Sequence, residues 1–115
     1  MTLDELRREQ EHAVVLANSQ GQIIAVNTPF SKLFGWAEAE IVGKPLTVII
    51  PRNLHDAHHL GFSRFVTTGR PTLLNQALDL KAVTREGREF DAEHFIVAEK
   101  DGDQWVFGAR IRPKG

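Results

Sequence analysis

Cysteine is absent from the 115 residues, which excludes disulfides, thiolate metal sites, cysteine nucleophiles and cofactors attached through sulfur. An excess of either charge sign is also missing. Fourteen basic and fifteen acidic side chains leave a formal net charge of −1, so the basic surface typical of a nucleic-acid binder is not indicated. No apolar run approaches the roughly 20 residues that cross a bilayer, and residues 1–10 are too polar for a signal peptide. We therefore expect a cytoplasmic protein without a nucleic-acid partner and without membrane insertion.

The composition that remains is typical of one globular domain. Hydrophobic residues make up 42% and charged residues 25% of the chain, close to the averages for soluble domains. Residues 1–11 predict a flanking helix, because Thr2 and Glu5 have capping-box spacing and Leu3 and Leu6 form a narrow apolar stripe. The domain itself is expected over residues 12–115.

Hydrophobic patterning predicts five strands and three short helices. Strands are expected at residues 13–17 and 22–26, with a turn between them, and at 73–84, 89–98 and 104–112. Helices are expected from about residue 28, with Asn27 or Thr28 as the N-cap, over residues 37–42, and over 53–68. This order predicts an α+β fold, a five-stranded antiparallel sheet with short helices on one face and an N-terminal flanking helix.

Several short motifs follow one another along this predicted framework. A hairpin at residues 18–27 ends in Asn27, and residues 34–46 read FGWAEAEIVGKPL. They are followed by Ile50-Pro51, His58, residues 68–71 (TGRP) and residues 85–90 (REGREF). In their order and spacing these motifs resemble the PAS domain family, over about residues 11–112.

The resemblance implies a sensory or signal-transduction module of the PAS/PAC type, as found in bacterial two-component proteins, and not an enzyme. Such a module binds a small ligand or cofactor between helices and sheet and regulates an output domain, for example a kinase or diguanylate cyclase, which is absent from this chain. It is also expected to form a homodimer. The alternative is a ligand-free PAS domain that serves dimerisation or another protein interaction.

The expected binding residues line the space between the central helices and the later strands. They are His58, Leu78, His94, Ile96, Trp105 and Phe107. A cavity of a few hundred cubic ångströms at these residues would favour ligand binding, whereas a filled core would favour the association alternative. The identity of the ligand is left open.

Haem is a second alternative, because His58 resembles the histidine that ligates iron in the oxygen-sensing PAS kinases of rhizobia. His58 is a metal ligand only if haem is bound. Leu78 stands where those kinases have a distal arginine, and His94 stands where they have an apolar residue, so the distal half departs from that pattern.

Two further interpretations concern surfaces. Phe95, Val97 and Val106 alternate to the face opposite the expected pocket, where Leu3 and Leu6 of the flanking helix either cover them or contact a second copy. The charged run at residues 85–89 is interpreted as a solvated turn.

Overall fold

The computed structural model describes residues 2–55 and 77–114. His58, most of the helix predicted over residues 53–68, and residues 73–76 of the third predicted strand lie outside the described residues. The described elements, in chain order, are α1 (Leu3–Arg8), β1 (Ala13–Ala17), β2 (Ile23–Val26), α2 (Thr28–Phe34), α3 (Glu38–Ile41), the 3₁₀ helices η1 (Leu46–Ile49) and η2 (Arg52–Leu54), β3 (Ala77–Val83), β4 (Glu89–Asp101) and β5 (Gln104–Pro113).

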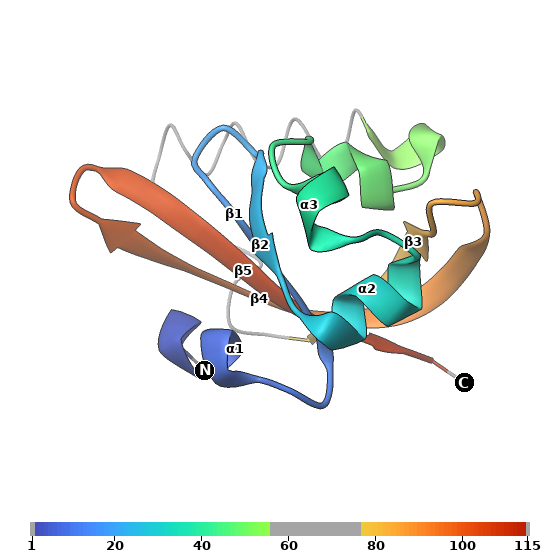
Figure 1. Cartoon of the computed structure of the whole chain (residues 1–115), viewed down its shortest axis with the longest axis horizontal. Helices are drawn as coiled ribbons and strands as arrows, with labels where there is room; N and C mark the ends of the chain where they lie inside the picture. Colours follow the sequence, from blue (N-terminus) through green and yellow to red (C-terminus); the bar gives the residue numbers. More distant parts are fainter. Residues whose placement is uncertain (1, 56–76, 115) are drawn as a thin grey trace.

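The five described strands form one antiparallel sheet in the order β2-β1-β5-β4-β3 (Figure 1). The last strand of the chain pairs with the first, so the N-terminal hairpin and the C-terminal strands share one sheet. This arrangement confirms the predicted α+β fold.

Helices α2 and α3 and the 3₁₀ helix η1 cover one face of the sheet, which we call the inner face (Figure 1). Phe30 and Phe34 of α2 are fully buried there, with ring centroids 4.4 Å apart. Phe34 also lies 5.5 Å from the ring of Phe90 on β4. An aromatic pair contributes roughly 0.5–1.5 kcal/mol beyond its buried area, so the contact between Phe34 and Phe90 fastens α2 to the sheet, whereas the pair of Phe30 and Phe34 lies within α2.

Helix α1 covers part of the opposite, outer face (Figure 1). The cluster beneath it contains Leu3, Leu6, Val14, Leu16, Val97 and Val106, with Ala25 and Phe95 packed against its edge. Of the two roles expected for Leu3 and Leu6, the structure shows the first, because they cover Val97 and Val106 within the same chain. The Leu3 amide also donates a hydrogen bond of 2.9 Å to the Glu99 carboxylate on β4.

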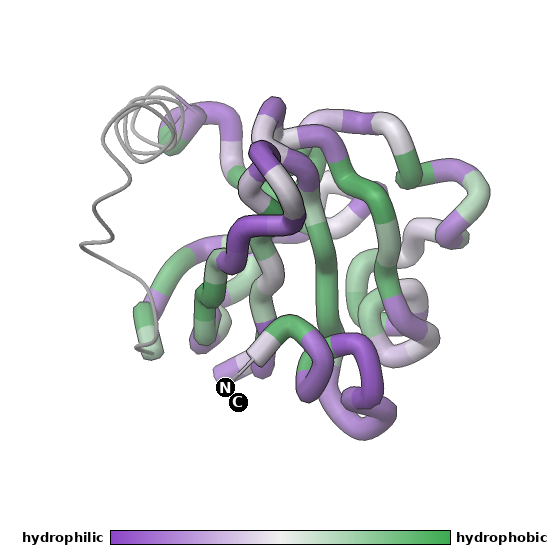
Figure 2. The backbone as a smooth tube through the Cα atoms, turned by 90° about the vertical axis from the view of Figure 1, so that its left-hand side faces the viewer, coloured by the Kyte–Doolittle hydropathy of each residue, from purple (hydrophilic) through white to green (hydrophobic). Residues whose placement is uncertain are grey.

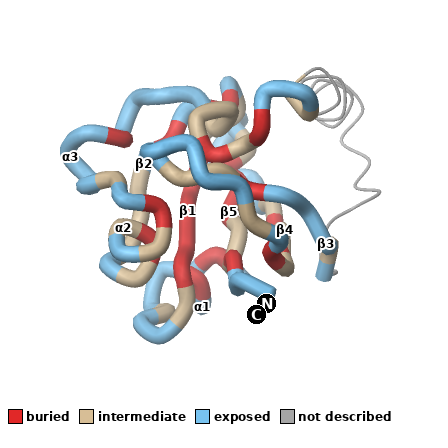
Figure 3. The backbone as a smooth tube through the Cα atoms, turned by 90° about the vertical axis from the view of Figure 1, so that its right-hand side faces the viewer, coloured by how far each residue is buried: buried red, intermediate tan, exposed pale blue. Residues whose placement is uncertain are grey.

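Strand β1 is buried along its whole length, as the continuous red trace in Figure 3 shows. Because both faces of this central strand are covered, its sequence AVVLA is apolar throughout instead of alternating. Figure 2 also shows this pattern: the strands in the interior are apolar, and the turns at the rim are hydrophilic.

Gly108 on β5 lies directly beneath α1. A Cβ atom at this position would lie 2.7 Å from a methyl carbon of Leu6 and 2.9 Å from methyl carbons of Leu3 and Leu16. A glycine inside a strand marks a place where another segment approaches closely. At Gly108 that segment is α1.

The side chain of Asn27 joins α1, β1 and α2. Its Oδ1 accepts hydrogen bonds from the amides of Val14 (2.9 Å) and Phe30 (3.1 Å). Its Nδ2 donates to the carbonyls of Glu9 (3.1 Å) and His12 (2.8 Å). Of the two expected caps, Asn27 and Thr28, the structure shows Asn27 as the N-cap of α2, and its side chain also holds the segment that connects α1 to β1.

Some element ends differ from the predicted ones. Helix α1 ends at Arg8, whereas a helix to residue 11 was expected. Strand β4 continues to Asp101, three residues beyond the predicted end, because Lys100 and Asp101 still pair with Trp105 and Gln104 on β5. The turn is therefore only two residues long, and its Gly102 has a φ of 66°. Two-residue hairpin turns favour glycine at such positions because they need positive φ.

We predict that Asn27→Asp lowers the free energy of unfolding by about 2 kcal/mol, since a carboxylate oxygen would replace the two donors and face two carbonyl oxygens. The cap of α2 would be kept, because Asp is also a good N-cap. Urea denaturation of the purified variant measures the change.

The matched control is Asn18→Asp, the same chemical change in the exposed β1–β2 turn. There the Asn18 Nδ2 donates to the side chain of Gln22, and the Oδ1, which Asp keeps, accepts from the amides of Gln20 and Gln22. Its effect should stay within about 0.5 kcal/mol. Equal urea midpoints for the two variants would contradict the role assigned to Asn27.

We predict that Gly108→Val releases α1 from the outer face, because the added methyl groups occupy the space of Leu3 and Leu6. Trypsin cleavage after Arg7 or Arg8 should then be about tenfold faster. Gly108→Ala should have a smaller effect, since leucine methyl groups are able to rotate away from a single Cβ. Cleavage at Arg88 in the β3–β4 turn serves as the internal control, and equal acceleration there would indicate general unfolding instead.

Candidate functional site

The inner face of β3, β4 and β5 is the candidate site. Strand register places His94 opposite Leu78 on β3 and Ile111 on β5. Ile96 lies two residues further along β4 on the same face. Trp105 and Phe107 lie on that face of β5, opposite Lys100 and Ala98. The five predicted binding residues that the structure describes thus share one face of the sheet, and the sixth, His58, lies outside the described residues.

Burial divides this face into two parts. Under the helices, Ala82, Ala92 and Ile111 are at most 1% exposed. From His94 toward the β4–β5 hairpin, several of the inner-face side chains are only partly buried. They are Leu78, Ile96, Ala98, Ala109 and Trp105. Apolar side chains on the inner face are therefore incompletely covered next to a closed core.

His94 lies at the boundary between these two parts. It is 8% exposed and is the one polar residue among the buried residues that the structure describes. Its Nδ1 is buried and has no hydrogen-bond partner within the described parts of the chain. Burial lowers the pKa of His94 below its ordinary value, and the backbone of Ala92 only partly offsets this. The imidazole is therefore neutral near pH 7.

The β4–β5 hairpin carries Trp105 to the end of this face. The Lys100 ammonium lies 5.6 Å from the centre of the Trp105 ring. Ser19 in the β1–β2 turn donates a hydrogen bond of 2.6 Å to the side chain of Gln104, next to Trp105. These contacts connect the tip of the hairpin to the β1–β2 turn.

Arg85 is a structural residue that the sequence interpretation missed. Its amide donates to the Phe34 carbonyl at the end of α2 (2.9 Å), and its guanidinium lies 4.9 Å from the Trp36 ring. The guanidinium also pairs with Glu40 at 2.6 Å and, chiefly through this bond, holds the pKa of that carboxyl below its ordinary value. The turn interpreted as solvated is thus fastened to the helices at its first residue, although nothing in a single charged run indicates its distant partners.

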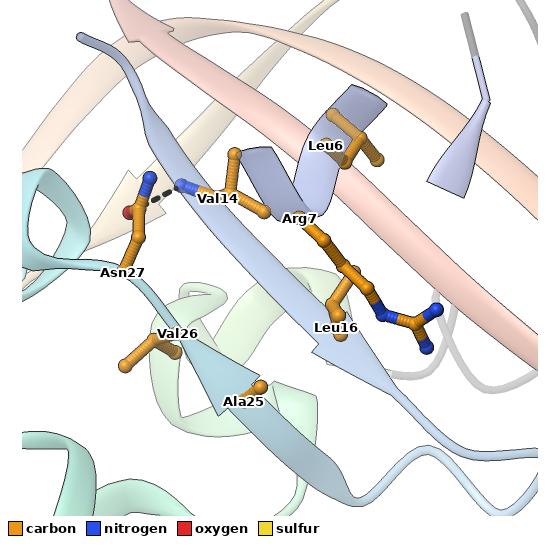
Figure 4. A pocket seen from close by; sticks show the side chains of 7 residues that line it. All are labelled: Leu6, Arg7, Val14, Leu16, Ala25, Val26 and Asn27. Atoms are coloured by element: carbon orange, nitrogen blue, oxygen red, sulfur yellow. Dashed lines mark hydrogen bonds between the residues drawn. The ribbon is translucent and has the colours of Figure 1, made fainter. Parts of the chain in front are cut away.

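A small hollow lies on the other face of the sheet, between α1 and strands β1 and β2 (Figure 4). Its lining residues are Leu6, Arg7, Val14, Leu16, Ala25, Val26 and Asn27. The volume is about 90 Å³, and since a water molecule takes about 30 Å³, this space is too small for a cofactor.

Neither a metal-binding cluster nor a membrane-spanning helix is present in residues 2–55 and 77–114. No group of three or more His, Cys, Asp or Glu side chains there is arranged to hold a metal ion. Within the same ranges, no helix has both the length and the apolar character needed to span a bilayer.

Curated relatives match most of the chain. A protein of Azorhizobium caulinodans, described only as uncharacterized, is 30% identical over 101 residues, which is 87% of this chain and 14% of that protein. The sensor protein FixL of Bradyrhizobium diazoefficiens is 25% identical over 100 residues, 87% of this chain and 20% of that protein. The chain thus spans about a seventh to a fifth of the length of these relatives.

Solved structures share the fold. The PAS domain of an HTR-like protein from Haloarcula marismortui has a TM-score of 0.75 at 17% identity, with 97% of this chain and 88% of that chain covered. A PAS domain from a two-component sensor histidine kinase has a TM-score of 0.71 at 16% identity, with 97% and 93% covered. The model of the PAS domain family matches residues 11–111. The antiparallel sheet, the helices on its inner face and this match over most of the chain together show that the chain belongs to the PAS domain family.

Proposed function

We propose that this PAS sensory domain binds a small ligand between its helices and the inner face, and that it regulates an output domain in a longer cytoplasmic protein. PAS domains are sensory modules, and the relatives are five to seven times longer than the matched region, which supports a role within a larger signalling protein. A histidine kinase or diguanylate cyclase is the kind of output that we propose.

One observation carries the ligand-binding part of this proposal. The inner face presents two partly exposed apolar side chains next to His94, Leu78 across the sheet and Ile96 along β4, and the buried Nδ1 of His94 has no hydrogen-bond partner among residues 2–55 and 77–114. Small-molecule sites combine an apolar lining with a few placed polar groups, and this part of the inner face has both.

We predict that the protein carries or takes up a small molecule at this face. Native mass spectrometry of freshly purified protein should show an added mass that denaturation removes. Absorption spectroscopy with added hemin tests the haem alternative, which would give a Soret band in the wild type that is lost in His58→Ala. Protein that carries no added mass and takes up no hemin would contradict ligand binding.

Self-association is a second candidate function, and the position of Phe95 favours it. Phe95 is only partly buried at the edge of the outer-face cluster, and the guanidinium of Arg110 lies 5.8 Å from its ring centre. An apolar ring at the rim of the surface that α1 leaves uncovered is a suitable contact for a second copy of the chain.

We predict a dimer that Phe95→Glu converts to a monomer, because the substitution places a charge in the contact. Multi-angle light scattering measures the mass, and far-ultraviolet circular dichroism confirms that the variant is folded. Val42→Glu is the matched control, since Val42 is 45% exposed at the end of α3 and lies outside the outer-face cluster. A folded Phe95→Glu variant with the wild-type mass would exclude this surface.

A further inference from the structure

Strand alternation separates the acidic side chains of β3 and β4 near His94 from the inner face, whereas the charged Lys100 lies on that face at the far end of β4, opposite Trp105. Asp79, Asp91 and Glu93 alternate with the inner-face residues and so lie on the outer face. There they pair with Lys114 (2.9 Å), Lys81 (3.1 Å) and Arg112 (3.0 Å), respectively. These three carboxylates of β3 and β4 are thus on the opposite side of the sheet from His94 and already have partners.

The inner-face positions around His94 are apolar. Its neighbours across the sheet are Leu78 and Ile111, and its neighbours along β4 on the same face are Ala92 and Ile96. None of these four described neighbours carries a charge, so a charged ligand group beside them would lose its hydration without an opposite charge from them, which is costly in an apolar environment. This part of the inner face therefore favours an uncharged molecule.

A buried polar atom without a hydrogen bond costs about 1–3 kcal/mol. Native proteins contain few such atoms, and each one calls for a physical explanation. The Nδ1 of His94 is such an atom within the described residues, and it lies beside apolar side chains that are partly open. A ligand that hydrogen-bonds to this Nδ1 would remove the cost, and it would cover Leu78 and Ile96 at the same time.

We propose that the ligand of this domain is an uncharged, mostly apolar molecule that places one hydrogen-bonding group on the imidazole of His94 and its apolar body over Leu78 and Ile96. This inference rests on the proposed function, since it specifies the chemistry of the ligand for the same face. His94 acts as the polar anchor, which selects for the hydrogen-bonding group, and the apolar residues supply most of the contact area.

Three probes of similar size test the inference, namely phenol, toluene and benzoate. Phenol is uncharged and is able to donate and accept a hydrogen bond, so it suits either tautomer of His94; toluene lacks the group, and benzoate is charged. Titrations are followed through the backbone amide shifts of His94, Ile96 and Ile111 in ¹⁵N-labelled protein. The imidazole ¹⁵N shifts of His94 report the hydrogen bond directly.

We predict that phenol moves the His94 imidazole signals and that benzoate does not bind measurably. His94→Leu should weaken phenol about tenfold relative to toluene, which is the loss of one hydrogen bond of about 1.4 kcal/mol. His94→Gln should keep most of the phenol affinity, because an uncharged hydrogen-bonding side chain remains. The matched control His12→Leu removes a histidine near Glu9, away from the inner face, and should change no affinity.

The outcomes separate this inference from the proposed function. If His94→Leu changes phenol and toluene binding equally, or if benzoate binds most tightly, the assigned ligand chemistry is wrong although the face binds small molecules. If no probe moves the inner-face amides while native mass spectrometry shows a bound molecule, the inference is again overturned and the proposed function stands. If neither experiment detects binding, both are wrong.

Discussion

The hydrogen bonds of the Asn27 amide are the interaction on which the arrangement of this domain depends. Four bonds from one side chain connect the end of the α1–β1 segment, the amide of Val14 and the first turn of α2. With both donors and both acceptor positions used, the side chain is fully satisfied in a partly buried place. These bonds thereby fix the position of α1 on the outer face and the position at which α2 begins on the inner face.

The two faces of the sheet serve different purposes as a consequence. The outer face is covered by α1 at one end, where Leu3 and Leu6 pack over Gly108, and carries ion pairs of β3, β4 and β5 at the other. The inner face is closed beneath α2, where burial is nearly complete, and is less completely covered around Ile96. His94 lies where these two parts of the inner face meet, which is why a single polar residue there has a large influence on what the face is able to bind.

Much of this was predictable from local patterns. Turn residues at 18–21 and the alternation of Phe90, Ala92, His94 and Ile96 predicted the strands and the residues that share a face, and the resemblance to PAS domains covered nearly the whole matched region. Arg85, Glu99 and Gly108 were missed as structural residues. Each makes contact with a segment far away in the sequence, and a charged residue in a turn or a glycine in a strand does not indicate which segment that is.

The sequence by itself determined the order of strands and helices along the chain, a cap at Asn27 or Thr28, and the face of the sheet to which each strand residue points. These features follow from backbone geometry and hydrogen bonding between near neighbours. Only the tertiary structure decided that α1 covers part of the outer face and that Arg85 fastens a turn to α2. It also decided that His94 is buried with no partner for its Nδ1 among the residues that the structure describes. Burial depends on which distant segments pack over a residue, and the apolar–polar alternation within a single strand does not indicate which segments these are.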